Sequence, residues 1–258
     1  MNNKIKKILK KKNKSKIVCL TAYSKNIAEI IDDHADIVLV GDSLGSVLYN
    51  YDTTRKVSLN MMIEHTKSAR MGVKKSLLVI DLPYNTYRNK SEALKNSKKA
   101  IKETKCDAVK VEGGTRVKEI VKHLVKNKIP VLGHIGITPQ TAKGKFRSKG
   151  KNESEIRKLL KDAQDLEQSG AFGIVLECIY SDISKQITNA INIPTIGIGA
   201  SVNCDGQVLV TDDLIGLNET KFRFVKKFGN IKKYIKSAVI KYKNSVKQKK
   251  FPSKKNSY

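Results

Sequence analysis

The sequence predicts a single-domain (β/α)8 barrel, or TIM barrel, in which eight parallel strands close into a cylinder surrounded by helices. Eight short apolar segments alternate with amphipathic helical patterns along most of the 258 residues. Several segments, such as residues 37–40, are apolar without polar alternation, which is typical of strands buried on both faces. Polar residues stand at the ends of successive strands, where parallel barrels carry their ligands.

The first half of the chain contains four predicted strands and three predicted helices. Each strand is a short apolar run that ends at a turn signal, and they span residues 16–23, 37–42, 76–81 and 107–114. The helices are predicted over residues 24–31, 58–71 and 91–104. Ser24 is suited to cap the first helix, and Gly72 ends the second. A longer loop covers residues 49–55.

The second half repeats the pattern with one long interruption. A helix runs through Lys126, and the loop over residues 135–152 is the longest, rich in Gly and Lys. Further helices are predicted over 153–168 and 181–191, and a basic helical region follows Asn218. The remaining strands are predicted over residues 129–134, 172–177, 194–199 and 207–210.

Composition limits the classes of protein to which the chain can belong. A hydrophobic fraction of 40% supports a full core, and no run of about 18 apolar residues predicts a membrane span. No apolar segment of a secretory signal follows the basic start, so we expect a cytoplasmic protein. The scattered Cys19, Cys106, Cys178 and Cys204 indicate reduced thiols. We expect the basic ends, residues 1–15 and 247–258, to be frayed.

The net charge of +27 invites a nucleic-acid-binding interpretation. The positive residues are nearly all Lys and are spread along the chain, and the sequence contains no Trp. Readers of nucleic acid usually gather Arg and aromatic residues in one patch. We therefore interpret most of the charge as solvated helix faces and expect no nucleic-acid partner.

Five successive predicted strands end in residues that can do chemistry. They are Asp42, Asp81, Glu112, His134 and Glu177. A doubly wound open sheet is the competing architecture, because periodicity alone does not separate it from a barrel. A closed barrel would bring all five strand ends to one mouth, whereas an open sheet would spread them along an edge. The pattern favours the barrel.

Asp42 and Asp81, with Glu112 near them, form a set of hard oxygen donors. Such a set suits Mg²⁺, which takes one or two carboxylates and leaves other positions to water and substrate oxygens. A strand-end Asp alone is as often a cap for the next turn. Two of them on neighbouring strands favour a ligand over a cap.

Three further side chains leave alternatives open. Glu177 emerges from an apolar segment and is suited to act as a general base, although a salt-bridged Glu is the plainer interpretation. Lys110 shares a strand face with Glu112, opposite Val109 and Val111. It could be a Schiff-base nucleophile, but a cation that keeps the carboxylates ionised fits better. His134 could donate to a substrate oxygen or be an ordinary hydrogen-bonding residue.

Seven motifs in chain order resemble the ketopantoate hydroxymethyltransferase family. They are Leu39-Val-Gly-Asp-Ser-Leu-Gly45, Asp81-Leu-Pro83, Val109-Lys-Val-Glu-Gly-Gly114, Gly133-His-Ile-Gly-Ile-Thr-Pro-Gln140, Val175-Leu-Glu-Cys178, Ile196-Gly-Ile-Gly-Ala200 and Cys204-Asp-Gly-Gln-Val-Leu-Val210. The resemblance implies a (β/α)8 barrel enzyme of pantothenate synthesis, assembled as a homo-oligomer, typically a decamer. It would transfer a hydroxymethyl group from 5,10-methylenetetrahydrofolate to 3-methyl-2-oxobutanoate, giving 2-dehydropantoate.

The resemblance also implies roles for single residues. Asp42 and Asp81 correspond to ligands of one Mg²⁺ per subunit, and Glu112 lies beside the metal. Substrate contacts are implied for Asp42, Ser43, Asp81, Lys110 and His134, and Glu177 corresponds to the catalytic base. A 2-oxo acid can chelate Mg²⁺ through its keto and carboxylate oxygens, and the metal stabilises the enolate that forms when the base removes the neighbouring proton.

The sequence departs from the family pattern at two places beside this site. Residues 143–150 replace a usual Gly-Gly and Gln-Gly pair, and Ser201 replaces a Gly after Ala200. We expect retained activity with an altered folate affinity. The alternative enzymes are a Mg²⁺-dependent 2-oxo-acid lyase or aldolase on the same barrel, and a class I aldolase that uses Lys110.

Overall fold

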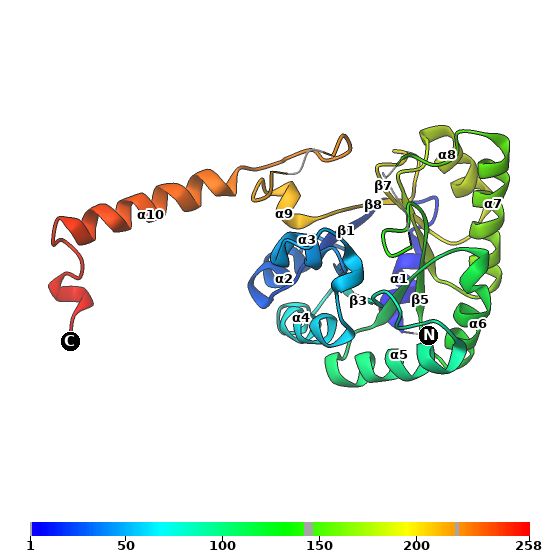
Figure 1. Ribbon diagram of the computed structural model, residues 1–258, viewed down its shortest axis with the longest axis horizontal. Helices are drawn as coiled ribbons and strands as arrows, with labels where there is room; N and C mark the ends of the chain where they lie inside the picture. The colour runs from blue at the N-terminus through cyan, green and yellow to red at the C-terminus, as the bar shows by residue number, and fades with distance from the viewer. Residues whose placement is uncertain (1, 142–146, 220–221) are drawn as a thin grey trace. The chain divides into compact units, whose positions relative to one another are not determined.

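The chain forms a closed parallel barrel in the computed structural model, which describes residues 2–141, 147–219 and 222–258 (Figure 1). Each strand pairs with the next in sequence, and the last pairs with the first. The strands are β1 Ile17–Thr21, β2 Ile37–Val40, β3 Leu77–Asp81, β4 Ala108–Glu112, β5 Val131–Gly136, β6 Gly173–Glu177, β7 Thr195–Ile198 and β8 Gly206–Leu209. The predicted barrel is confirmed, and the open doubly wound sheet is excluded.

Helices follow the strands in the predicted alternation. They are α2 Lys25–Asp32, α4 Leu59–Gly72, α5 Lys90–Thr104, α6 Lys118–Lys126, α7 Glu153–Gln168 and α8 Ser181–Ala190. Ser58, Asn89 and Asn152 cap α4, α5 and α7 by accepting a hydrogen bond from the backbone three residues on. Ser24 occupies the cap position of α2, but its side chain accepts no capping hydrogen bond, so that part of the prediction was wrong.

Helix α1, Asn3–Lys10, corrects the prediction that residues 1–15 form a frayed end. Ile5 and Ile8 are buried, at 1% and 3% exposure, and belong to the cluster of apolar side chains inside the barrel. Lys4 anchors the helix, since its Nζ donates to the carbonyl oxygen of Ser76 over 2.8 Å. The dense lysines conceal this apolar face in the sequence, because they lie on the solvent side of the same helix.

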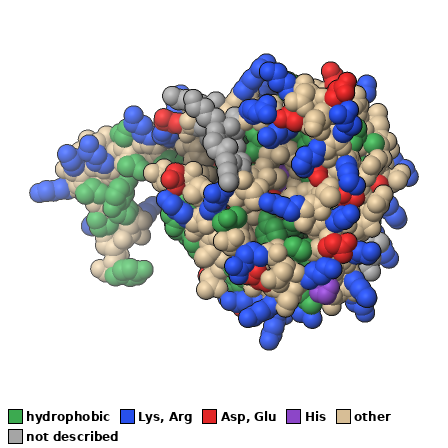
Figure 2. All heavy atoms as spheres, turned by 45° about the vertical axis from the view of Figure 1, so that its right-hand side comes forward, with side chains coloured by type: hydrophobic (Ala, Val, Ile, Leu, Met, Phe, Trp, Pro, Cys, Tyr) green, Lys and Arg blue, Asp and Glu red, His purple; other side chains and the backbone are tan. Residues whose placement is uncertain are grey.

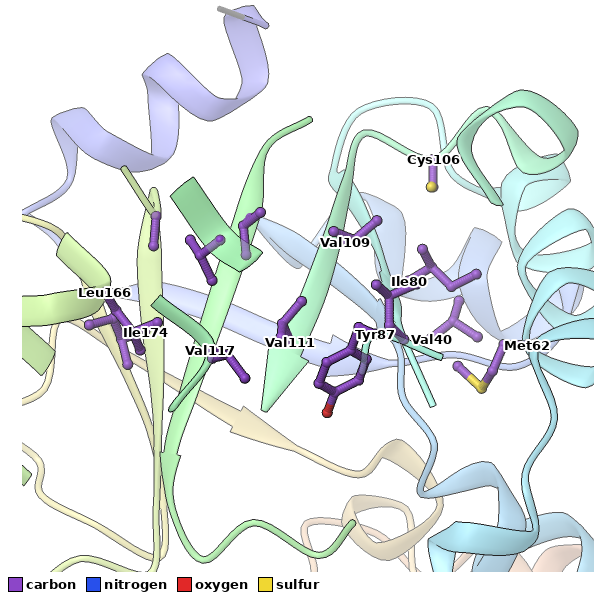
Figure 3. Close-up of a cluster of buried hydrophobic side chains, with 14 of the residues drawn as sticks. Val40, Met62, Ile80, Tyr87, Cys106, Val109, Val111, Val117, Leu166 and Ile174 are labelled. Atoms are coloured by element: carbon purple, nitrogen blue, oxygen red, sulfur yellow. The ribbon is translucent and has the colours of Figure 1, made fainter. Parts of the chain in front are cut away.

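The apolar core has two layers separated by the strands. Outward-facing residues such as Val109 and Val111 form one apolar cluster with side chains of the surrounding helices, among them Met62 of α4. Figure 3 shows part of this outer cluster. Inward-facing residues, among them Leu39 and Val79, fill the barrel beneath its mouth. Residues on β4 alternate between the two layers, so the prediction that Val109 and Val111 share one face is confirmed.

Two compact units make up the chain, Met1–Val210 and Thr211–Tyr258. The first contains the whole barrel. The second contains the short α9, Thr211–Leu214, and the longer α10, Ile231–Lys247. No side chain of α10 is buried. The organisation of all 258 residues as one domain therefore stays a prediction, as does fraying of residues 247–258.

The distribution of charged side chains and the free cysteines agree with the sequence analysis. Lys and Arg side chains are spread over the face shown in Figure 2, with Asp and Glu among them. The four cysteines are free. Burial raises the pKa of the Cys106 and Cys178 thiols to about 11, which makes both poor nucleophiles at neutral pH. Within the described ranges, no helix is long and apolar enough to cross a membrane.

Candidate active site

Three carboxylates meet inside the mouth of the barrel. Asp81 and Glu112 are the last residues of β3 and β4, and Asp42 follows β2 by two residues. One oxygen from each carboxylate lies within 4.8 Å of the other two. All three side chains are buried, at 5% exposure or less. Parallel pairing explains the convergence, because it aligns the carboxyl ends of neighbouring strands.

Lys110 provides the positive charge for this centre. Its Nζ lies 2.6 Å from Asp81 Oδ2 and 3.7 Å from Glu112 Oε1, and the side chain is buried. Burial alone would lower the pKa of Lys110, but the carboxylates of Asp81 and Glu112 raise it well above its usual value. A Schiff-base nucleophile needs a neutral amine. The arrangement therefore favours the ion-pairing interpretation of Lys110 over the class I aldolase alternative.

His134 links the acidic centre to Glu177. Its Nδ1 lies 3.3 Å from Glu112 Oε1, and its Nε2 lies 3.2 Å from Glu177 Oε2, although neither contact has hydrogen-bond angles. Burial and the Lys110 cation lower the pKa of His134, but Glu112 and Glu177 outweigh them and raise it to about 9. The Glu177 side chain is 21% exposed, so this carboxylate can be reached from the mouth.

Ser43 lies at the start of α3, Leu44–Tyr49, a helix that sequence reasoning did not predict. The hydroxyl of Ser43 is 2.8 Å from the hydroxyl of Tyr23, the last residue of the first predicted strand, which lies two residues beyond the end of β1. Ser43 is half-buried beside Asp42 in the chain. The part of Ser43 in the site rests on its place next to Asp42 in the chain.

Gln140 is a residue of this centre that sequence reasoning missed. It is fully buried, and its Nε2 donates to Asp42 Oδ2 over 2.9 Å and to the carbonyl oxygen of Leu82 over 3.0 Å. Its backbone N–H donates to Glu112 Oε2 over 3.1 Å, and its Oε1 accepts from the hydroxyl of Tyr87. Gln140 ends the motif over residues 133–140, which was the only signal available in the sequence.

The residues present fit a bound divalent cation. Asp81 Oδ1 is buried and has no hydrogen-bond partner in the described part of the chain. Burial, together with repulsion from Asp81 and Glu112, raises the pKa of Asp42 well above its usual value, and burial also raises that of Asp81. Three buried carboxylates face the Lys110 and His134 cations, so the acidic groups outnumber the positive charges around them. An oxygen-only donor set suits Mg²⁺.

Ser201, one of the two departures from the family pattern, is a buried residue. At 2% exposure, its Oγ accepts a hydrogen bond from Ser181 over 3.0 Å and another from the backbone of Asn203 over 3.2 Å. The first half of the other departure, residues 143–146 of 143–150, lies outside the described residues, which resume at Arg147. The altered folate affinity therefore stays a prediction.

A (β/α)8 barrel with a buried acidic centre at the carboxyl ends of its strands belongs to the class of barrel enzymes that work at that mouth. The model of the ketopantoate hydroxymethyltransferase family matches residues 2–254 of the chain. The chain therefore belongs to this family and is an enzyme of this kind.

Full-length relatives agree with the family match. The 3-methyl-2-oxobutanoate hydroxymethyltransferase of Pelagibacter ubique is 62% identical over 258 residues, which cover 100% of both chains. The enzyme of the same name from Rhizobium etli is 47% identical and covers 92% of this chain and 88% of its own. Phosphoenolpyruvate phosphomutase from Streptomyces platensis has a similar fold, with a TM-score of 0.63 at 9% identity, covering 95% of this chain and 87% of that one.

Proposed function

We propose that the enzyme transfers a hydroxymethyl group from 5,10-methylenetetrahydrofolate to 3-methyl-2-oxobutanoate, giving 2-dehydropantoate for pantothenate synthesis. The observation that carries the proposal is the convergence of Asp42, Asp81 and Glu112 within 4.8 Å in a chain of this family. Water supplies the hydroxyl oxygen of the product, and tetrahydrofolate leaves.

Asp42, Asp81 and Glu112 would hold one Mg²⁺ per subunit. When bound, Mg²⁺ supplies Lewis-acid chemistry that withdraws electrons from the keto oxygen of the substrate. Lys110 keeps the Asp81 carboxylate ionised and in place through the 2.6 Å contact. Lys110, His134 and Ser43 would contact substrate oxygens together with the two aspartates.

Glu177 would remove the proton from C3 of the keto acid. Its carboxylate is the most exposed of the acidic groups described at the mouth, which allows a substrate to approach it. The His134 ring, whose Nε2 lies 3.2 Å from Glu177 Oε2, would help to hold this carboxylate in place. The carbanion formed at C3 then makes the new carbon–carbon bond with the one-carbon unit, provided both reactants are held in one mouth.

The proposed reaction is tested by direct assay of the purified full chain. With Mg²⁺, 3-methyl-2-oxobutanoate and 5,10-methylenetetrahydrofolate, we expect 2-dehydropantoate and tetrahydrofolate in equal amounts. Turnover of the keto acid without any folate would instead support the lyase or aldolase alternative. No turnover of either kind by folded protein would reject the proposal.

We also propose a cytoplasmic homo-oligomer, a decamer as the family resemblance implies. The free cysteines support a reducing compartment. Self-association is supported by α10, whose apolar side chains are exposed. They are Tyr234, Ile235, Val239, Ile240, Tyr242 and Val246. A run of apolar side chains on one helix is costly in water and marks an interaction surface.

Placing a charge on this helix is expected to break the oligomer. Val239→Asp puts a carboxylate among the exposed apolar residues, where association would have to bury it without a partner. Light scattering after size exclusion should show a smaller species than the wild type. Ser237→Asp is the matched control, because it lies roughly 200° around the helix from Val239. Equal masses for all three proteins would exclude α10 from the interface.

A further inference from the structure

A second hollow lies beside the carboxylate centre, on the loops that carry its residues. A cavity of about 500 Å³ is lined by the segments after β4 and β5 and by the first turns of α7. Gly113 and Ile135 of its lining directly follow Glu112 and His134. Thr138 and Thr141 flank Gln140. The volume is that of a small-molecule site.

The lining of this cavity carries an excess of positive charge. Arg116, Arg147, Lys149 and Lys158 line it, against the two carboxylates of Glu155 and Asp162. Both carboxylates are already used, Glu155 by Arg147 and Asp162 by Lys158. Across the described ranges, no carboxylate forms an ion pair with Arg116 or Lys149. Four cations thus face two carboxylates in one concave wall, and this excess of positive charge favours an anionic ligand.

We propose that this cavity binds the glutamyl end of the folate co-substrate, with its carboxylates at Arg116 and Lys149. The inference rests on the proposed function. A guanidinium matches a carboxylate through two parallel hydrogen bonds, and the ammonium of Lys149 suits the second acid group. Arg116 Nη2 would lie 3.3 Å from a Cβ built on Gly113, so the guanidinium folds over the residue next to Glu112. A co-substrate bound there would lie against the segments that carry Glu112 and His134.

The test compares two co-substrates, 5,10-methylenetetrahydrofolate and 5,10-methylenetetrahydropteroate, which lacks the glutamate. For the wild type, loss of the glutamate should raise KM about 100-fold, equivalent to two charge-assisted contacts. For Arg116→Gln and Lys149→Gln, which each remove one contact, KM for the folate should rise about tenfold, while KM for the pteroate stays unchanged. Arg157→Gln is the matched control, because Arg157 lies on α7 outside the cavity and pairs with Glu153.

The outcomes separate this inference from the proposed function. Exchange of the C3 proton of 3-methyl-2-oxobutanoate without folate should be the same in Arg116→Gln and the wild type. Equal KM values for the folate in wild type and both variants would overturn the glutamyl site, even if transfer is normal. The glutamyl site would also be overturned if the two variants raised KM for the folate and for the pteroate by the same factor. Absence of transfer in the wild type would instead reject the proposed function.

A second inference, carried by different contacts, concerns Gln140. We infer that Gln140 is a positioning residue for the metal centre. Its side-chain amide holds Asp42 Oδ2, and its backbone N–H holds Glu112 Oε2, so one residue fixes one oxygen on each of two carboxylates. Gln140 leaves the second oxygen of each carboxylate, Asp42 Oδ1 and Glu112 Oε1, unoccupied by its own contacts. Tyr87 fixes the amide by donating to Gln140 Oε1, which leaves Nε2 as the group directed at Asp42.

The test of the Gln140 inference measures Mg²⁺ binding calorimetrically in the absence of substrate. Loss of such an outer contact usually lowers metal affinity 10–100-fold, so we expect Kd to rise by about that factor in Gln140→Leu. Tyr87→Phe removes only the hydroxyl and should raise Kd less, with little change in the Tm of the metal-free protein. A fall in Tm without a change in Kd in either variant would reduce Gln140 to a packing residue and overturn the inference.

Discussion

Replacing Glu177 with glutamine is expected to slow exchange of the C3 proton of 3-methyl-2-oxobutanoate by about 10²–10⁴-fold, the usual effect of removing a general base. Glutamine keeps the shape of the side chain but cannot accept the proton. The reaction is followed by proton NMR in deuterated water, with Mg²⁺ and without folate. Leaving out the folate isolates proton removal from the later carbon–carbon bond formation.

The control for this experiment is Glu153→Gln. Glu153 begins α7, is 87% exposed at its side chain and pairs with Arg157, so its replacement should leave exchange unchanged. Circular dichroism and mass would show that both variants fold and assemble. If Glu177→Gln exchanges the proton as fast as the wild type, Glu177 is not the base and another group must remove the proton.

The architecture and most of the centre could be predicted because parallel strands leave a strong local pattern. Residues 37–40 are continuously apolar because both faces of the strand are buried. Asp81 and Glu112 are charged residues that end the apolar runs of their strands. In a parallel sheet, Asp81 then lies beside Lys110 of the neighbouring strand. The sequence could therefore place these side chains at one mouth without knowledge of any distance.

The parts that were missed depend on long-range contacts without a local period. Gln140 lies on a loop, and nothing near it in sequence indicates that it turns inward to reach Asp42, 98 residues away. Ile5 and Ile8 are a short apolar pair among lysines, and only the open amino end of the barrel makes their burial favourable. In both cases the closed barrel supplies the contact partners from distant parts of the sequence.

Asp42→Asn is expected to abolish Mg²⁺ binding and turnover while leaving the metal-free protein at least as stable as the wild type. The affinity should fall by more than about 100-fold, since loss of a direct ligand exceeds the 10–100-fold effect of outer contacts. Removing Mg²⁺ from the wild type with a chelator should likewise stop turnover. Stability should not fall, because burial and the charges of Asp81 and Glu112 raise the pKa of Asp42 in the folded chain.

The sign of the stability effect follows from that raised pKa. A carboxyl group whose folded pKa exceeds its unfolded value costs stability as pH rises from the unfolded pKa to the folded one. An asparagine has no such cost, and its amide can donate toward the remaining carboxylates while its oxygen still accepts from Gln140. Thermal unfolding of both metal-free proteins at pH 8 measures the difference, with the exposed Asp33→Asn as control. A clearly lower Tm for Asp42→Asn would show that this carboxylate is structural, and unchanged Mg²⁺ affinity would remove it from the metal centre.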